Sequence, residues 1–236
     1  ADMAAGGLLM EIASRPLPRD LAVKPASPMA QMSAVVLAAG QSRRMGKINK
    51  LTTVVAGKPV IRHVLDTVLK AGFKDIVVVL GFDEQAVSAC LEGLPVRFVK
   101  NEAFRSGQAS SVSAGIAALD NNVSDVMVVL GDMPLLSAAL LNNLHHHHMR
   151  NPQHEQMISL PVCLKDRERQ VGHPVIWGRQ FFPDLQALTG DQGGRQIWSD
   201  HPAIINQMDV EDATLFLDTD TAEALRRAEV LLLARN

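Results

Sequence analysis

Short apolar runs and amphipathic stretches alternate along the chain from residue 33 onward. The runs Ser33–Ala38, Asp75–Gly81 and Val126–Gly131 are rich in branched residues and end at small or turn residues, which is typical of strands buried on both faces. Pro59 is suited to the first turn of a helix that keeps one apolar face until Gly72. This alternation predicts an α/β fold, a three-layer sandwich with a mostly parallel central sheet and helices on both faces.

The remaining pattern predicts shorter elements and one large domain. Further strands are expected at Val96–Lys100, Met157–Val162, Val171–Trp177, Ala203–Val210 and Leu215–Asp218. Further helices are expected at Glu84–Leu91, Ser110–Leu119, Ser137–Leu144, Phe181–Leu188 and Thr221–Leu233. Residues 33–236 form a single domain in this interpretation, with the second half supplying a substrate-binding flap. Residues 1–32 are rich in proline and lack a sustained period, so we expect a linker or N-terminal arm, as would remain from a larger fusion.

Composition excludes several classes of protein. The net charge of the 236 residues is −2, so no global field attracts nucleic acid, and any anion site must be local. No apolar run reaches the roughly 18–20 residues that a membrane span needs, and no secretory signal is recognised at the N-terminus. Cys90 and Cys163 lie far apart without metal-ligand spacing, which favours reduced thiols and a cytoplasmic location.

The most informative segment is residues 35–51, VVLAAGQSRRMGKINKL. A buried strand opens onto small residues and then a loop with Arg43, Arg44, Lys47 and Lys50, an arrangement that binds phosphate through backbone N–H groups and cations. Neither the Walker A ending nor the Gly-x-Gly-x-x-Gly dinucleotide signature is present. A strand followed by a merely solvated basic loop is the simpler alternative.

Other polar segments follow predicted strands. Asp132, in the segment LGDMPL, comes at the carboxyl end of a buried strand, where it suits either a magnesium ion or a helix cap. The segment 101–115 offers small polar groups at a helix start, and a cap by Ser106 or Ser110 would explain only part of it. In the segment LDTDT, Asp218 and Asp220 point to opposite faces if extended, so at most one would reach a metal, and Asp220 could instead cap a helix.

The run His145–His148 cannot supply one ligand set, because consecutive helical residues point about 100° apart. A solvated helix end is the expectation, with adventitious binding of nickel or zinc by His145 and His148 as the alternative.

The segment 35–51 resembles the signature of the MobA-like nucleotidyltransferases, L-A-(A/G)-G-x-S-x-R-M-G-x-x-K-L. The matching positions are Leu37, Ala38, Ala39, Gly40, Ser42, Arg44, Met45, Gly46, Lys50 and Leu51. The GDMPL segment recurs in this family, whose fold is the nucleotide-diphosphosugar-transferase-like (Rossmann-like) sandwich. The GHP segment at 172–174 and GDQGGR at 190–195 resemble the molybdenum cofactor cytidylyltransferase branch.

The resemblance implies roles for individual residues. Lys50, Arg44 and Asp132 would be catalytic, and Asp132, Asp220 and Asp218 would be candidates for holding Mg²⁺, with Mn²⁺ as a substitute. The nucleotide would be bound by Leu37, Ala38, Ala39, Gly40, Ser42, Arg43, Gly46, Gly81, Asn101, Gly107, Gln108, Ser110 and Ser111. The acceptor would be bound by His173, Gly190, Asp191, Gly193, Gly194 and Arg195.

The implied reaction moves CMP from CTP to the terminal phosphate of the molybdopterin cofactor, releasing pyrophosphate. A molybdenum hydroxylase or its chaperone would be a transient partner. Three alternatives remain: a guanylyltransferase on the same cofactor, a cytidylyltransferase on a sugar or polyol phosphate, and a non-catalytic module that escorts the cofactor.

Overall fold

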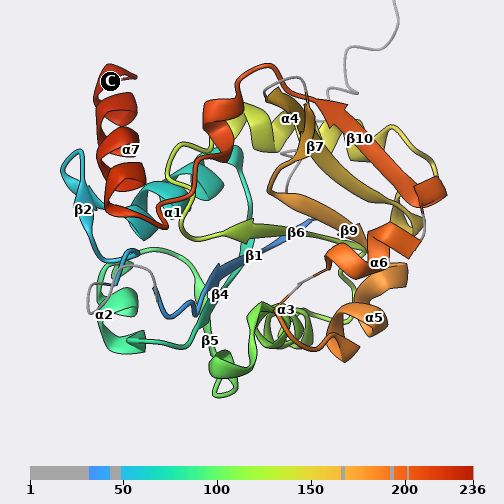
Figure 1. The fold of residues 1–236 in the computed structure, drawn as a ribbon. Helices are drawn as coiled ribbons and strands as arrows, with labels where there is room; N and C mark the ends of the chain where they lie inside the picture. The colour runs from blue at the N-terminus through green and yellow to red at the C-terminus, as the bar shows by residue number, and fades with distance from the viewer. Residues whose placement is uncertain (1–31, 43–48, 166–167, 192–193, 201, 236) are drawn as a thin grey trace, which may run out of the picture.

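The computed structural model describes residues 32–42, 49–165, 168–191, 194–200 and 202–235. Its centre is an eight-stranded sheet with the strand order β10-β7-β9-β6-β1-β4-β5, and β8 pairs with β7 off this path (Figure 1). The strands are β1 Ser33–Ala38, β4 Asp75–Leu80, β5 Arg97–Lys100, β6 Asp125–Leu130, β7 Ile158–Lys165, β8 Glu168–Val171, β9 Val175–Gly178 and β10 Ile205–Asp209. A separate two-stranded ladder joins β2 Val54–Val55 to β3 Lys58–Pro59.

Helices cover both faces of the sheet, as the sequence predicts (Figure 1). They are α1 Val60–Ala71, α2 Glu84–Ala89, α3 Gln108–Ala117, α4 Ala138–Met149, α5 Phe182–Ala187, α6 Arg195–Asp200 and α7 Ala222–Ala234. Alternate residues of β1 enter different cores: Ala34 and Val36 pack with α1 and α4, whereas Val35 and Leu37 pack with α3 and α5. The three-layer α/β sandwich is therefore confirmed.

The parallel strands place their carboxyl ends at one edge of the sheet. β1 pairs in parallel with β4 on one side and with β6 on the other, so that Leu37 lies opposite Val79 and Leu130. The amide of Gly131 donates to the carbonyl of Leu37 at 3.0 Å and continues this ladder by one residue. A Cβ at Gly131 would approach that carbonyl oxygen to 2.7 Å, so glycine suits the position.

The second half of the chain departs from the predicted pattern in three places. Val171–Trp177 was predicted as one strand, but the chain turns at Gly172 and forms β8 and β9, with a cis His173–Pro174 peptide between them. The predicted strand Leu215–Asp218 is wrong, because Ala213–Phe216 forms a 3₁₀ turn. α6 has no counterpart among the predicted elements, since the glycines before it broke the apolar pattern.

The prediction of a solvated helix end at His145–His148 is also wrong. α4 continues to Met149, and His145 and His148 are buried, with 5% and 0% exposure. They follow Leu141 and Leu144 at helical spacing and so extend the buried stripe of the same helix.

Within the described residues, no helix combines the length and apolar character that a membrane crossing requires.

Candidate active site

The loop after β1 brings its small residues and Lys50 to one pocket. We call this cavity of about 440 Å³ the acidic pocket, and its lining includes Leu37, Ala39, Gly40, Ser42, Lys50, Asp132, Asp218 and Asp220. Ser42 has a left-handed backbone with φ of 52°, and its Oγ accepts a hydrogen bond from the amide of Lys50 at 3.1 Å. This bond holds the backbone of Lys50 beside Ser42. The predicted phosphate-binding residues Arg43, Arg44 and Gly46, with Met45 and Lys47, lie outside the described residues.

Lys50 is the electrostatic centre of the acidic pocket. Its ammonium forms ion pairs with the carboxylates of Asp132 and Asp220, which lie 82 and 170 residues away in the sequence. Burial disfavours the charged form of Lys50, but the attraction of Asp132 and the hydrogen bonds to both carboxylates outweigh it and raise the pKa of Lys50. The Lys50 ammonium is thus held between Asp132, which follows β6, and Asp220, which precedes α7.

A buried threonine fixes the two acidic segments together. The amide and the hydroxyl of Thr219 both donate to the carbonyl oxygen of Asp132, at 3.0 and 3.1 Å. The amide of Asp220 donates to Asp218 Oδ1 at 3.3 Å, so this segment turns rather than extends. The premise that Asp218 and Asp220 point to opposite faces was wrong for this reason, and both line the acidic pocket.

The helix-cap alternatives for the acidic residues are not observed. Ser137 caps α4 by accepting from Leu140, and Thr221 caps α7 by accepting from Ala224. Asp132 and Asp220 are therefore available for the pocket.

The acidic pocket contains carboxylates, the type of ligand that a hard divalent cation prefers. Asp132, Asp218 and Asp220 place three acidic groups around the single described ammonium of Lys50. Burial and the neighbouring charges of Asp220 and Asp132 raise the pKa of Asp218. Mg²⁺ and Mn²⁺ prefer such oxygen ligands, and one or two carboxylates with substrate phosphates complete their shell.

The other side of the acidic pocket is the start of α3. Gly107, Gln108 and Ser111 line it. Gly107 has φ of 119°, and a Cβ there would approach Asp191 Oδ1 to 2.5 Å. The structure shows no side-chain cap at α3, so neither Ser106 nor Ser110 explains this segment.

Four predicted nucleotide-binding residues support the pocket without lining it. Asn101 is buried and donates to the hydroxyls of Ser110 and Ser111, at 2.9 and 3.0 Å. A Cβ at Gly81 would approach the Cβ of Ala39 to 2.7 Å, so Gly81 lets the strands close up behind that alanine. Ala38 points to the opposite face and belongs to the core with α1.

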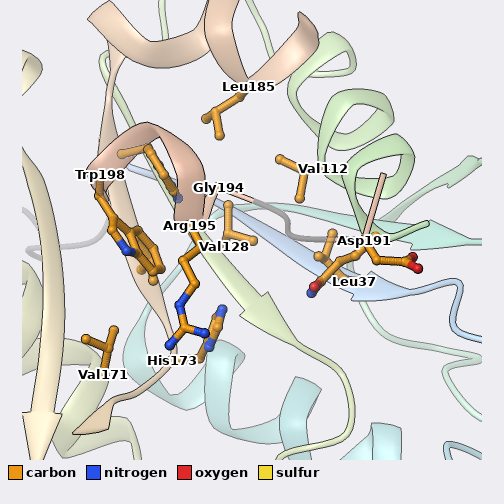
Figure 2. Close-up of a pocket in the computed structure, with 13 residues that line it drawn as sticks. Leu37, Val112, Val128, Val171, His173, Leu185, Asp191, Gly194, Arg195 and Trp198 are labelled. Carbon is orange, nitrogen blue, oxygen red and sulfur yellow. The ribbon is translucent and has the colours of Figure 1, made fainter. Parts of the chain in front are cut away.

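A second cavity of about 560 Å³ adjoins the acidic pocket and shares Leu37, Gln108 and Asp191 with it (Figure 2). We call it the tryptophan pocket, because Trp177 of β9 and Trp198 of α6 stack there with ring centroids 5.8 Å apart. Figure 2 shows the side chains of Arg195 and His173 lying side by side in this cavity.

The acceptor residues predicted from sequence mostly gather at the tryptophan pocket. His173, Asp191, Gly194 and Arg195 line it. Gly190 does not line it, but its carbonyl accepts from the amide of Ala109 at 3.1 Å and ties this loop to α3. Gly193 lies outside the described residues.

The electrostatics of the tryptophan pocket favour a neutral imidazole beside a guanidinium. Burial lowers the pKa of His173 to about 4; the charge of Asp132 opposes this effect and that of Arg195 adds to it. His173 therefore offers a neutral ring with one hydrogen-bond donor and one acceptor near neutral pH. Arg195 supplies a fixed positive charge suited to a carboxylate or phosphate.

Sequence reasoning missed both tryptophans and the pair Phe104 and Arg105, which line the acidic pocket. The available signal was weak: the chain has only two tryptophans, and both lie in one cavity. A Cβ at Gly194 would overlap the Trp177 ring, so the glycine-rich segment before α6 lets that ring approach the backbone.

Comparison with known proteins agrees with this geometry. The model of the MobA-like NTP transferase domain family matches residues 34–205. Nicotine blue oxidoreductase of Paenarthrobacter nicotinovorans is 29% identical over 197 residues, which cover 83% of this chain and 95% of that protein. GlmU, a bifunctional protein of Sinorhizobium fredii, is 41% identical over 112 residues, and the match spans only 24% of that protein's length.

Solved structures show the same fold. Rv0371c from Mycobacterium tuberculosis H37Rv superimposes with a TM-score of 0.72 at 27% identity, covering 85% of this chain and 98% of the other. A structure of the same protein in complex with manganese gives a TM-score of 0.68. The sheet and its helices thus have the nucleotide-diphosphosugar-transferase fold, and the chain belongs to the family of MobA-like NTP transferase domains.

Proposed function

We propose that the chain transfers CMP from CTP to the terminal phosphate of molybdopterin carrying molybdenum, with release of pyrophosphate. The observation that carries this proposal is the pair of adjoining pockets, one acidic with a buried lysine, the other aromatic with an arginine. Such a pair suits two substrates that meet through phosphate groups. Leu37, Gln108 and Asp191 line both pockets and so mark the place where the phosphates would meet.

The acidic pocket would hold the triphosphate. The ammonium of Lys50 would move from its two carboxylates to the α-phosphate and offset the charge that develops there during transfer. The backbone after Ala39 and the side chain of Arg44 would hold the β- and γ-phosphates. Asp132 and Asp220, with Asp218 beside them, would hold Mg²⁺ or Mn²⁺, which supplies charge neutralisation and orientation when bound.

The tryptophan pocket would hold the acceptor. A flat heteroaromatic ring fits against stacked Trp177 and Trp198, and Arg195 would pair with the acceptor phosphate. An oxygen of that phosphate attacks the α-phosphorus of CTP as the bond to the bridging oxygen breaks, and pyrophosphate leaves. The acceptor phosphate is already anionic, so no side chain needs to remove a proton, and the chain's task is alignment.

Ala39 offers a physical reason for cytosine. Its methyl group lines the acidic pocket, and the close approach behind it at Gly81 leaves it no room to retreat. A methyl in this place would crowd a purine ring more than a pyrimidine. If this reasoning holds, Ala39→Gly relaxes the preference for CTP over GTP, and an unchanged preference would remove the steric argument.

The test of the proposed function is pyrophosphate release with Mg²⁺ and molybdenum-loaded molybdopterin, comparing CTP with GTP, ATP and UTP. A clear CTP preference supports the proposal. Preference for GTP would indicate the guanylyltransferase, and turnover with a sugar phosphate instead of molybdopterin would indicate the other cytidylyltransferase. Cofactor binding without any turnover would indicate the escort module.

A second candidate is an oxidoreductase for a flat heteroaromatic compound. One relative, 29% identical over most of this chain, carries the name nicotine blue oxidoreductase, and the stacked tryptophans would suit such a ring. If the chain is such an enzyme, it should catalyse the loss of colour of nicotine blue by a supplied reductant, without any nucleoside triphosphate. Pyrophosphate release in the first assay, with no bleaching in this one, would exclude it.

The proposal also includes the bounds of the domain, a partner and a location. The domain would be residues 33–236, with residues 1–32 as a linker or arm, and the cofactor product would pass to a molybdenum hydroxylase or its chaperone in the cytoplasm.

A further inference from the structure

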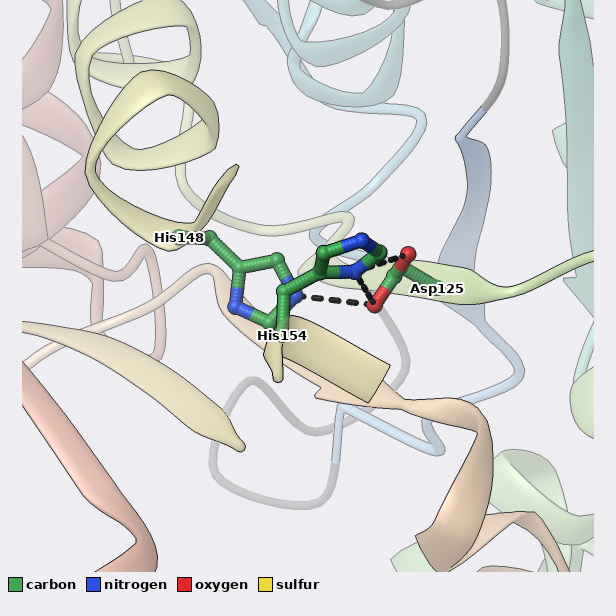
Figure 3. Close-up of side chains that lie close together, drawn as sticks. All are labelled: Asp125, His148 and His154. Carbon is green, nitrogen blue, oxygen red and sulfur yellow. Dashed lines mark hydrogen bonds and ion pairs between the residues drawn. The ribbon is translucent and has the colours of Figure 1, made fainter. Parts of the chain in front are cut away.

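Three side chains of the types that ligate metals meet at the amino end of β6, at the end of the strand away from the acidic pocket (Figure 3). Asp125 is the first residue of β6, His148 is in the last turn of α4, and His154 lies in the 3₁₀ turn before β7. His148 Nε2 lies 2.9 Å from Asp125 Oδ1, and His154 Nδ1 lies 2.9 Å from Asp125 Oδ2. One ligand atom from each residue falls within 4.8 Å of the others, and these three form the one such group found among the described residues.

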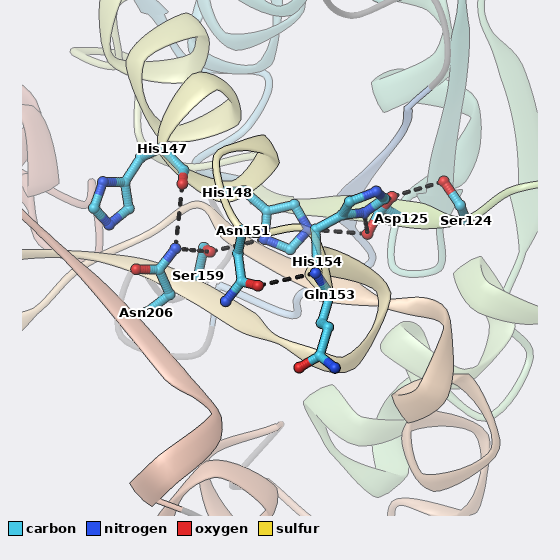
Figure 4. Close-up of polar contacts among 9 residues, drawn as sticks. All are labelled: Ser124, Asp125, His147, His148, Asn151, Gln153, His154, Ser159 and Asn206. Atoms are coloured by element: carbon cyan, nitrogen blue, oxygen red, sulfur yellow. Dashed lines mark hydrogen bonds and ion pairs between the residues drawn. The ribbon is translucent and has the colours of Figure 1, made fainter.

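A second layer of hydrogen bonds orients two of these side chains, His148 and Asp125 (Figure 4). Ser159 Oγ lies 2.7 Å from His148 Nδ1 and accepts from Asn206 Nδ2 at 3.2 Å. Ser124 donates to Asp125 Oδ2 at 2.6 Å. Metal-binding histidines nearly always have their other ring nitrogen held in this way, which fixes the orientation of the ring.

The hydroxyl of Ser159 suits both protonation patterns of His148. When Nε2 carries the proton and donates to Asp125, the Ser159 hydroxyl can donate to Nδ1. When Nε2 binds a metal, Nδ1 carries the proton, and Ser159 Oγ can accept it because an oxygen with two lone pairs accepts from both His148 and Asn206.

We propose that Asp125, His148 and His154 bind a divalent transition-metal ion of the zinc class, separate from the metal of the acidic pocket. Two imidazole nitrogens with one carboxylate suit zinc rather than Mg²⁺ or Ca²⁺, and a water would complete a tetrahedral shell. Ligand atoms of such a shell lie about 3.3 Å apart, so the two histidine–aspartate distances of 2.9 Å would lengthen only a little on binding the ion. The His154 side chain is 20% exposed and provides a path from solvent.

The bound ion would stabilise the fold by joining neighbouring segments and would take no part in nucleotidyl transfer. Asp125 is the first residue of β6, and Asp132 follows the other end of that strand by two residues, so the length of the strand, roughly 17 Å, separates the two sites. An ion there would join β6, the end of α4 and the turn before β7, three segments that otherwise meet through side-chain hydrogen bonds. The competing interpretation is that these hydrogen bonds are the whole purpose of the cluster.

The test uses the full chain, stripped of metal by a chelator and then dialysed against Zn²⁺ with excess Mg²⁺ to occupy the acidic pocket. Bound zinc is counted per chain, and the melting temperature is followed with and without zinc. His154→Ala is the main variant because its partial exposure favours folding, and His146→Ala is the matched control, an exposed member of the same histidine run. Ser159→Ala keeps all three ligands and removes the second-layer bonds that Ser159 makes to His148 and Asn206.

The expected result is one tightly bound zinc per chain in the wild type and in His146→Ala, with a higher melting temperature on zinc addition. His154→Ala should lose this zinc and the thermal response, while pyrophosphate release stays as in the wild type. Ser159→Ala should bind zinc roughly 10–100-fold more weakly. Zinc retained by His154→Ala, zinc lost equally from His146→Ala, or a wild type that binds none would each overturn the proposal.

Discussion

The neutral state of His173 makes the stability of the protein sensitive to acid. Burial lowers the pKa of this imidazole to about 4 in the folded chain, from 6.5 in its unperturbed state. The folded state therefore resists protonation over a pH range in which the unfolded chain accepts a proton. Stability that is complete above about pH 6.5 is lost as the pH falls towards 4.

The magnitude follows from the difference of 2.5 between 6.5 and about 4. One pKa unit corresponds to about 1.4 kcal/mol, so His173 alone should lower the free energy of unfolding by about 3 kcal/mol across this range. His173→Gln keeps a polar side chain of similar size but cannot titrate. Its free energy of unfolding should fall less steeply with acid than that of the wild type, by about 3 kcal/mol over the same interval.

The assay is urea unfolding of both proteins at about pH 7.5 and about pH 4. For each protein, the free energy of unfolding at the lower pH is subtracted from that at the higher pH, and the readout is the difference between the two results. Other titrating groups are common to both proteins and cancel in that difference. Arg195→Gln separates the effect of burial from that of the neighbouring charge, because both lower the pKa of His173. Burial remains in this variant, so its loss of stability in acid should be only slightly smaller than that of the wild type. Equal losses of stability in the wild type and in His173→Gln would refute the reasoning.

Four further predictions concern the acidic pocket and the core. Lys50→Ala removes the cation between Asp132 and Asp220, so pyrophosphate release should fall at least about 100-fold with an unchanged circular dichroism spectrum. Removing divalent metal with a chelator should abolish pyrophosphate release, and added Mg²⁺ should restore it; activity that survives chelation would contradict the role of the carboxylates. Gly107→Ala places a methyl 2.5 Å from Asp191 Oδ1 at φ of 119°. It should lower the free energy of unfolding in urea by about 1–3 kcal/mol and weaken nucleotide binding. Unchanged stability and binding would show that the contact between the start of α3 and the Asp191 loop is looser than the structure has it. Leu141→Ala empties a fully buried position of α4 and should cost about 2–5 kcal/mol in the same assay, whereas a loss below 1 kcal/mol would mean that this core relaxes.

The first half of the fold was predictable because its strands are buried on both faces. Ser33–Ala38 was predicted with the observed bounds, whereas the prediction for β4 differs from the structure by one residue at one end and that for β6 by one residue at each end. Continuous apolar runs of this kind have no other stable place than the middle of a sheet. The predicted strand Val171–Trp177 failed because periodicity does not record the turn at Gly172, where a Cβ would approach the ring of Phe216 to 2.5 Å.

The site was predictable in its residue types but not in its contacts. Local motifs pointed to Lys50, Asp132 and Asp220, yet the ion pairs among them span 82 and 170 residues, a separation that no local pattern encodes. The buried histidines had a usable signal, because His145 and His148 continue the spacing of the leucines before them. Asp125, the partner of His148, had no such signal, since an acid at the start of a strand usually faces solvent.

The strand order explains why the two pockets adjoin. β9 runs antiparallel between β6 and β7 and places Trp177 opposite Val126 on one side and Ile158 on the other. The second half of the chain therefore extends the same sheet, and the tryptophan pocket opens beside the carboxyl ends of β1 and β6. The bond from Ala109 to Gly190 then ties the loop before α6 to the start of α3, which also lines the acidic pocket. Because one sheet and one loop contact fix both pockets, two bound phosphates could meet there without a domain having to close.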